Sequence, residues 1–185
     1  MDELVVKGIQ KWPNVPSVFG WLSLDERGRW RLDGGLVRNR RTISAINRNY
    51  LCDEGGRWYY QNGPQRAYVD LNYTPWVYLL DGQGGLTTHT GLKTRKVKSC
   101  WLDDEYHLLL QTEHGIGQVG DHDLGVVLDN VVNSDGKPAD WLDIEKAVHS
   151  YTSDLYLHWG VALPIGIIAR ATVAARFGFI ERPRD

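Results

Sequence analysis

The chain repeats one short pattern four times, and this repeat limits the possible folds more than any other feature. Each copy is an apolar residue, an aspartate, a short polar turn and a bulky apolar residue that opens an extended run; the copies occupy residues 24–32, 52–60, 80–88 and 102–110. An aspartate that accepts hydrogen bonds from turn N–H groups, with a glycine that takes positive φ, is typical of a β-hairpin. Glycine closes three of the turns, and the fourth copy lacks it. Four unevenly spaced copies do not fit a propeller or solenoid, so we predict duplicated hairpin modules with insertions.

Short helices are expected between and around the hairpins. Apolar residues at helical spacing predict helices over 42–50 and 121–132, the latter capped by Asp121 or Asp123 and burying Leu124, Val127, Leu128 and Val131. Residues 2–12 predict a helix that ends before Pro13. Alternating residues predict strands over 67–71 and 76–80 around the 73–75 turn.

The last part of the chain has a different pattern. It predicts a helix over 140–151, a strand pair over 155–159 and 163–169 around Gly160, and a final helical turn over 171–177. No long Ser, Gly or Pro linker interrupts the sequence. We therefore expect one α+β, strand-dominated domain over 1–185, with the repeated hairpin and helix region at 1–137 and a C-terminal elaboration at 138–185.

Composition supports strands and tight turns. The 185 residues include eight Trp, nine Tyr and twenty Gly but only three Phe. A chain of this length buries enough surface to need no disulfide or metal. Cys52 and Cys100 lie in apolar runs without zinc spacing, so we expect both to be small buried side chains. The predicted core contains Trp21, Trp30, Trp58, Trp76, Tyr68, Val69, Leu71, Leu109, Leu124 and Leu128, with several tryptophan N–H groups hydrogen-bonded.

The charge is distributed unevenly. Residues 1–100 carry 15 basic and 9 acidic residues, whereas residues 101–185 carry 6 and 14. Three interpretations fit this asymmetry. The two halves can face and neutralise each other, the first half can present a basic face to nucleic acid, or the second half can present an acidic interaction face. The acidic start is unlike a signal peptide, and the longest apolar run, 161–169, is too short to span a membrane. We expect a soluble, cytoplasmic protein.

Three motifs carry a resemblance to a known family. They are WPNVPSVFGWL at residues 12–22, NGPQRAYV at 62–69 and RFGF at 176–179, followed by Pro183. Together they resemble an uncharacterised proteobacterial family, described only as a domain of unknown function, along nearly the whole chain. The resemblance implies no activity, cofactor or catalytic residue. The hairpin–helix–hairpin order is also similar to other bacterial families with duplicated β-rich motifs and a suggested signalling role.

The run from Tyr60 to Arg66 is the most distinctive local motif. Asn62 and Gly63 predict a hairpin turn, and a turn alone is sufficient to explain them. Gln65 and Arg66 add amide and guanidinium groups beside aromatic residues, and guanidinium groups match carboxylates or phosphates. A site for a small polar or anionic ligand is therefore the alternative interpretation.

Two histidines follow strands in similar settings. His89 and His114 each come after a threonine and before a glycine, within two residues of both, at the exit of a strand. Glu113 directly precedes His114. If the modules are duplicated, these three side chains could form a general-base or metal cluster. Separate surface histidines with partners are the simpler interpretation, because no metal-binding spacing is present. We assign no metal, cofactor or catalytic residue.

Two further motifs suggest nucleotide chemistry. The run 115–120 matches G-x-G-x-x-G, but the acidic residues that follow would repel a phosphate and no βαβ unit is present. Basic runs at 38–48 and 93–98 could contact nucleic acid, or they could be solvated loops.

These observations favour a non-enzymatic binding or signalling module. We expect a groove between repeated hairpin units, which binds a small polar or anionic ligand or a protein partner, with no membrane partner. Its candidate lining residues are Asn62, Gln65, Arg66, His89 and His114. The alternatives are a hydrolase that uses His89 or His114 with Glu113, and a nucleic-acid binder that uses the two basic loops.

Overall fold

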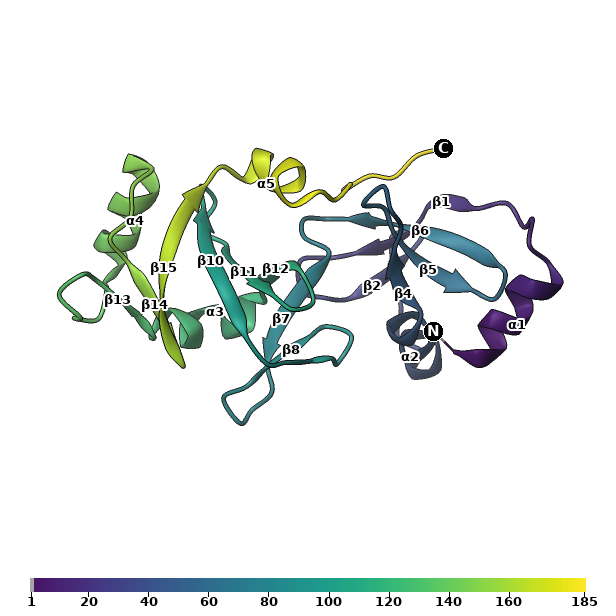
Figure 1. Ribbon diagram of the computed structural model, residues 1–185, viewed down its shortest axis with the longest axis horizontal. Helices are drawn as coiled ribbons and strands as arrows, with labels where there is room; N and C mark the ends of the chain where they lie inside the picture. Colours follow the sequence, from purple (N-terminus) through teal and green to yellow (C-terminus); the bar gives the residue numbers. More distant parts are fainter. Residues whose placement is uncertain (1) are drawn as a thin grey trace. The chain divides into compact units, whose positions relative to one another are not determined.

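The computed structural model describes residues 2–185, which form two compact units (Figure 1). Unit 1 contains residues 2–75 and 177–185, and unit 2 contains residues 76–176. Over this range the chain has five helices and fifteen strands, so the prediction of an α+β, strand-dominated fold is confirmed. The single-domain organisation, with its division after residue 137, stays a prediction.

Unit 1 is built on a six-stranded sheet. Its elements are α1 (Glu3–Lys11), β1 (Val18–Leu24), β2 (Trp30–Leu32), β3 (Gly35–Leu36), α2 (Arg40–Arg48), β4 (Tyr50–Cys52), β5 (Trp58–Asn62) and β6 (Gln65–Leu71). The strand order is β3-β2-β1-β6-β5-β4, and the central pair, β1 and β6, is parallel. All other neighbours in this sheet are antiparallel.

Unit 2 is built on a nine-stranded sheet. Its elements are β7 (Trp76–Leu80), β8 (Leu86–Thr88), β9 (Lys93–Thr94), β10 (Val97–Asp103), β11 (Leu108–Thr112), β12 (Ile116–Val119), α3 (Asp121–Leu128), β13 (Val131–Val132), α4 (Trp141–Ser150), β14 (Tyr156–Trp159), β15 (Val161–Ile168) and α5 (Arg170–Phe177), whose last residue belongs to unit 1. The strand order is β13-β14-β15-β10-β11-β12-β7-β8-β9. The two parallel pairs are β7 with β12 and β10 with β15.

The fifteen strands form five meanders, each of three consecutive antiparallel strands. Meanders 1 to 5 are β1–β3, β4–β6, β7–β9, β10–β12 and β13–β15. Neighbouring meanders in a sheet always join in the same way, because the first strand of one lies parallel to the last strand of the next. Helices α2 and α3 each connect two such meanders. The duplicated hairpin modules predicted from the sequence are thus present, with the same topology in both units.

The same turn geometry closes the first hairpin in each of meanders 1 to 4. In the turn after β1, Asp25 Oδ1 accepts hydrogen bonds from the backbone N–H groups of Arg27 (3.1 Å) and Arg29 (2.9 Å). Equivalent pairs of bonds are made by Asp53, Asp81 and Asp103. All four predicted hairpins are therefore confirmed.

A fifth turn of this kind begins at Asn133, and the sequence analysis missed it. Asn133 Oδ1 accepts from the N–H groups of Asp135 (3.1 Å) and Lys137 (3.0 Å). An asparagine stands where the other turns have aspartate, and α4 separates this turn from β14. The turn residue three positions after the Asx has positive φ, as at Gly136 (75°). In the hairpin without glycine, Tyr106 takes this conformation, with a φ of 65°.

The predicted core is correct for six residues. Trp30, Trp76, Tyr68, Val69, Leu71 and Leu109 are buried. Leu124, Leu128 and Trp58 are half-buried, and Cys52 is exposed while Cys100 is buried. Trp21 was placed in the core wrongly: 64% of it is exposed. The buried residues of β1 are Leu22 and Leu24, so Trp21 is out of step with the buried positions of its strand.

The predicted helices and strands outside the hairpins are present with adjusted ends. The helix expected over 121–132 ends at Leu128, and its cap residue is Gly120, so the prediction of Asp121 or Asp123 as the cap is wrong. Both lie in the first turn of the helix, where Asp123 accepts a hydrogen bond from the backbone N–H of Leu80 (2.9 Å). Strands β6 and β7 belong to different sheets, so the segments on either side of the 73–75 turn do not pair. No helix in the described part of the chain is long and apolar enough to cross a membrane.

Candidate ligand-binding site

A cavity of about 600 Å³ lies within unit 1 between meanders 1 and 2. It runs along one face of the sheet and reaches the connection that leads into α2. Its lining residues are Val18, Trp21, Leu22, Leu32, Gly35, Leu36, Val37, Arg38, Asn39, Thr42, Ile46, Tyr60, Asn62, Gln65 and Ala67. The cavity lies between two repeated hairpin units, and of the five residues predicted to line a groove it contains Asn62 and Gln65.

Strand pairing produces the apolar part of the cavity. Leu22 lies opposite Leu32, and Ala67 lies between Val18 and Tyr60, so side chains from neighbouring strands form a continuous surface. Most of this surface is open to solvent at the meander 1 end, where Leu32 is 53% exposed and Leu36 is 37% exposed. Together with Trp21, these residues form an exposed apolar patch of the kind that marks binding surfaces.

Helix α2 is held against the sheet by buried aromatic side chains. Trp30 donates its indole N–H to Asn47 Oδ1 at 2.7 Å, and its ring packs edge-on against Tyr50. The Tyr50 hydroxyl donates to the backbone carbonyl of Pro75. This confirms the expectation that a core tryptophan keeps its N–H bonded, and it fixes Ile46 of the same helix, which is buried at the cavity wall.

Polar groups line the ends of the cavity. Asn39 caps α2, and its side-chain oxygen accepts from the N–H groups of Arg41 and Thr42. At the meander 2 end, the Tyr60 hydroxyl lies 3.4 Å from Asn62 Oδ1 and can donate to it. Gln65 Nε2 donates to the backbone carbonyl of Pro16 at 3.1 Å. The cavity thus combines an apolar body with amide groups at its edge, as small-molecule sites commonly do.

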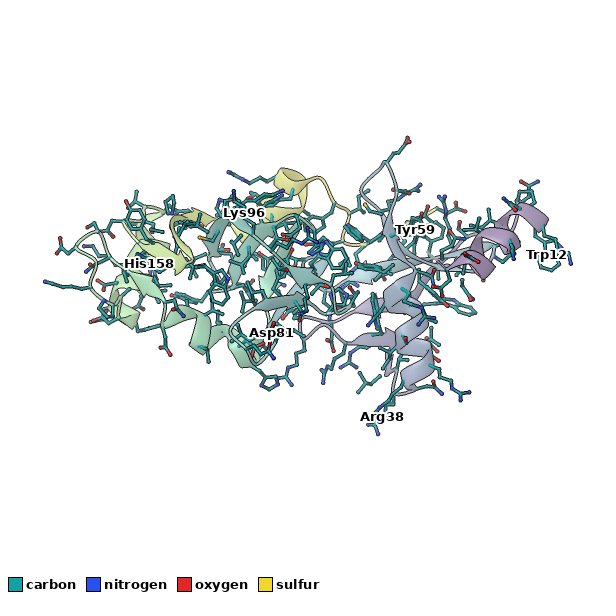
Figure 2. The ribbon with its side chains drawn as sticks, turned by 60° about the horizontal axis from the view of Figure 1, so that its bottom comes forward. Trp12, Arg38, Tyr59, Asp81, Lys96 and His158 are labelled. Atoms are coloured by element: carbon teal, nitrogen blue, oxygen red, sulfur yellow. The ribbon has the colours of Figure 1, made fainter. Side chains whose placement is uncertain are left out.

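Strand alternation divides the residues predicted around the 62–66 turn. Asn62 and Gln65, which pair across the turn, line the cavity. Arg66 follows Gln65 and therefore points to the opposite face of the sheet, where its guanidinium lies 4.7 Å from the ring centre of Tyr59 (labelled in Figure 2). The structure thus brings two of these three predicted site residues together.

His89 and His114 both belong to unit 2, where they contact the same tryptophan. Their ring centres lie 5.5 Å and 6.1 Å from that of Trp76. His89 Nδ1 accepts a hydrogen bond from the backbone N–H of Val77 (3.3 Å), and burial lowers the pKa of His89 to about 3. His114 Nε2 lies 3.0 Å from the backbone carbonyl of Lys93. These contacts give both rings a structural role, and the lowered pKa of His89 is far from the near-neutral value that an effective general base needs.

Glu113 holds the neighbouring loop. Its carboxylate accepts hydrogen bonds from the backbone N–H groups of Arg95 (2.6 Å) and Lys96 (3.4 Å). Partial burial raises the pKa of Glu113, but these hydrogen bonds outweigh it, so the pKa lies below its ordinary value. Among residues 2–185 no group of three or more His, Cys, Asp or Glu side chains is placed to hold a metal ion. His114 Nε2 lies 3.8 Å from Glu113 Oε1, which is beyond hydrogen-bond distance. The hydrolase alternative stays a prediction.

The remaining nucleotide-related motifs have local structural explanations. The run 115–120 contains β12, and a Cβ on Gly117 would lie 2.6 Å from the backbone carbonyl of Trp76, so packing requires glycine there. The basic run 38–48 lies in unit 1, where Arg48 forms an ion pair with Asp2 (3.1 Å), and the run 93–98 lies in unit 2. Nucleic-acid binding through these runs stays a prediction.

Comparisons with known proteins give a family and a fold. A family model described as "Protein of unknown function (DUF2946)" matches residues 1–184, and the comparison with curated proteins found no match. The chain is similar to the crystal structure of a DUF1285 family protein from Silicibacter pomeroyi DSS-3, with a TM-score of 0.54 and 13% identity over 90% of this chain and 96% of that chain. A DUF1285 family protein from Shewanella baltica OS155 gives a TM-score of 0.42 and 15% identity over 56% of this chain and 86% of that chain.

The first of these structures shows a shared fold, and the identity is too low to show more. The family match confirms the predicted resemblance to a family of unknown function along almost the whole chain. The chain belongs to the family of proteins of unknown function described as DUF2946.

Proposed function

We propose that the protein is a non-enzymatic binding module that holds a small molecule with an apolar body in the unit 1 cavity. The observation that carries this proposal is the combination of a volume of about 600 Å³ with an open apolar wall. Small-molecule sites are about 300–1,000 Å³ and are lined mainly by apolar and aromatic side chains with a few polar groups. The cavity matches both properties.

Trp21 is the central residue of the proposal. It lines the cavity, yet 64% of it is exposed, which leaves a large aromatic surface without protein packing. Burying an aromatic side chain completely contributes about 1.5–3 kcal/mol. A ligand that covers part of the Trp21 ring would therefore gain about 1.4 kcal/mol, a tenfold change in Kd.

The position of the cavity also fits a binding role. Each side is formed by a separate meander, and the hydrogen bond between Trp30 and Asn47 fixes the helix that closes one end. In such a preformed site, the ordering of side chains and loops costs little free energy when a ligand binds.

The test uses a neutral apolar fluorophore, N-phenyl-1-naphthylamine, titrated into the full chain. We expect saturable binding with a rise in probe emission, and a Trp21→Ala variant should bind about tenfold more weakly. Trp141→Ala is the matched control, because Trp141 is 54% exposed in α4 and does not line the cavity. No saturable binding, or equal weakening in both variants, would overturn the proposal.

A further inference from the structure

The walls of the unit 1 cavity carry one charged side chain. Among the residues that the structure describes, Arg38 is the only charged one that lines the cavity, and no acidic one does so. Arg38 is exposed, and Figure 2 shows it beside the start of α2 with its side chain extended toward solvent. An apolar cavity with a single cationic group at its edge has the charge pattern of a site for an amphipathic anion.

Several arginines of unit 1 have a carboxylate partner, but Arg38, which lines the cavity, has none within residues 2–185. Arg29 and Arg31 pair with Asp25, and Arg57 pairs with Asp53 at 2.8 Å. No ion pair or side-chain hydrogen bond joins Arg38 to another described residue. Its guanidinium therefore keeps its full capacity for two parallel hydrogen bonds to an anion.

The residues around Arg38 increase the positive potential. Arg40 and Arg41 follow it at the start of α2, and the first turn of this helix contains no acidic residue. The backbone N–H groups of Arg41 and Thr42 are already bound by Asn39. The guanidinium groups, and not the end of the helix, are thus the groups available to an anion.

We propose that the ligand of this cavity is an amphipathic anion, whose apolar chain contacts Trp21 and Leu32 while Arg38 binds its anionic head group. This inference rests on the proposed binding function and names its ligand class. A carboxylate and a phosphate monoester share the required chemistry, since both present two anionic oxygens to a guanidinium. The apolar wall requires a chain or ring system next to that head group.

The experiment measures how four octyl compounds displace N-phenyl-1-naphthylamine from the full chain. They are octanoate, octyl phosphate, octan-1-ol and octyltrimethylammonium, which share a chain and differ in head group. We expect an anionic compound to compete about fivefold better than octan-1-ol, with octyltrimethylammonium weakest, as fits an ion pair near the surface. The better of the two anions identifies the head group, and 0.5 M NaCl should reduce the preference by screening.

The decisive variant is Arg38→Gln, with Lys7→Gln as its control. Lys7 lies in α1, does not line the cavity, and loses the same single charge on substitution. We expect Arg38→Gln to remove the preference for the anion and leave octan-1-ol unchanged, and Lys7→Gln to retain the preference. Equal competition by octanoate, octyl phosphate and octan-1-ol, or equal losses in both variants, would overturn this inference while the binding function stands. If the fluorophore itself does not bind, the proposed function and the inference both fail.

Discussion

The repeated turn can be tested at Asp25, which is 6% exposed and has hydrogen bonds to both carboxylate oxygens. Its Oδ1 atom accepts two backbone N–H groups of the turn, and its Oδ2 atom accepts from Arg29 Nε (2.9 Å) and Arg31 Nε (3.2 Å). Burial raises the pKa of Asp25, but the hydrogen bonds from Arg29 outweigh it and the pKa lies below its ordinary value. The carboxylate is therefore charged at neutral pH.

Two substitutions separate these contacts. Asp25→Ala removes both backbone hydrogen bonds, about 1 kcal/mol each, and both ion pairs, about 0.5 kcal/mol each because the arginines are 35–42% exposed. We expect it to lower the free energy of unfolding by about 3 kcal/mol. Asp25→Asn keeps an oxygen for the backbone groups, as Asn133 does in the fifth turn, and should cost about 1 kcal/mol.

The assay is urea unfolding of the full chain followed by circular dichroism. Because two compact units can unfold in separate steps, hydrogen exchange at the amides of Arg27 and Arg29 identifies the transition of unit 1. The exchange of these amides should speed up in Asp25→Ala much more than in Asp25→Asn. If the two variants lose the same stability, within about 0.5 kcal/mol, the shared turn geometry is not what stabilises the hairpin.

Two other predictions concern backbone strain and pH. Gly56 has a φ of 76°, and an added Cβ would collide with the backbone carbonyl of Gly178. At Gly34 nothing lies within 4 Å of an added Cβ, so Gly34→Ala should cost only the ~1–2 kcal/mol of backbone strain. Gly56→Ala should therefore destabilise unit 1 well beyond Gly34→Ala, and equal urea midpoints for the two variants would contradict this. Burial lowers the pKa of His89 to about 3, whereas an unfolded histidine titrates near 6.5. As pH falls below about 6.5 the unfolded chain takes up the proton first, so stability should fall by about 1.4 kcal/mol per pH unit. His89→Asn should lose this part of the pH dependence in urea unfolding from pH 7 to pH 4.5, and an unchanged slope would show that His89 is not the cause.

The local chemistry of the turns made much of the fold predictable. An aspartate followed by a residue with positive φ fixes a hairpin within a few residues, so four of the five turns could be found directly. The fifth was missed because Asn133 replaces aspartate, although its side-chain oxygen accepts the same two hydrogen bonds. A search for either Asx residue with glycine three positions later would have found it.

The candidate site was predictable only in part, because it depends on strand register. Asn62 and Gln65 were identified from the turn that joins their strands, and they do line the cavity. Arg66 was grouped with them, but adjacent strand residues face opposite sides of a sheet. Trp21 and Arg38 are outside the predicted site: apolar character predicted a core position for the tryptophan, which is exposed, and the arginine is part of a predicted basic run.

Hairpin positions, the short helices and the α+β class follow from the sequence itself, because each depends on hydrogen bonds and apolar spacing within a few residues. The parallel pairing of β1 with β6 joins strands more than forty residues apart, and no local signal specifies it. That pairing brings Val18 beside Ala67 and thereby creates the cavity wall. The tertiary structure alone decided which residues share the site, since only the register of distant strands determines which side chains meet on one face.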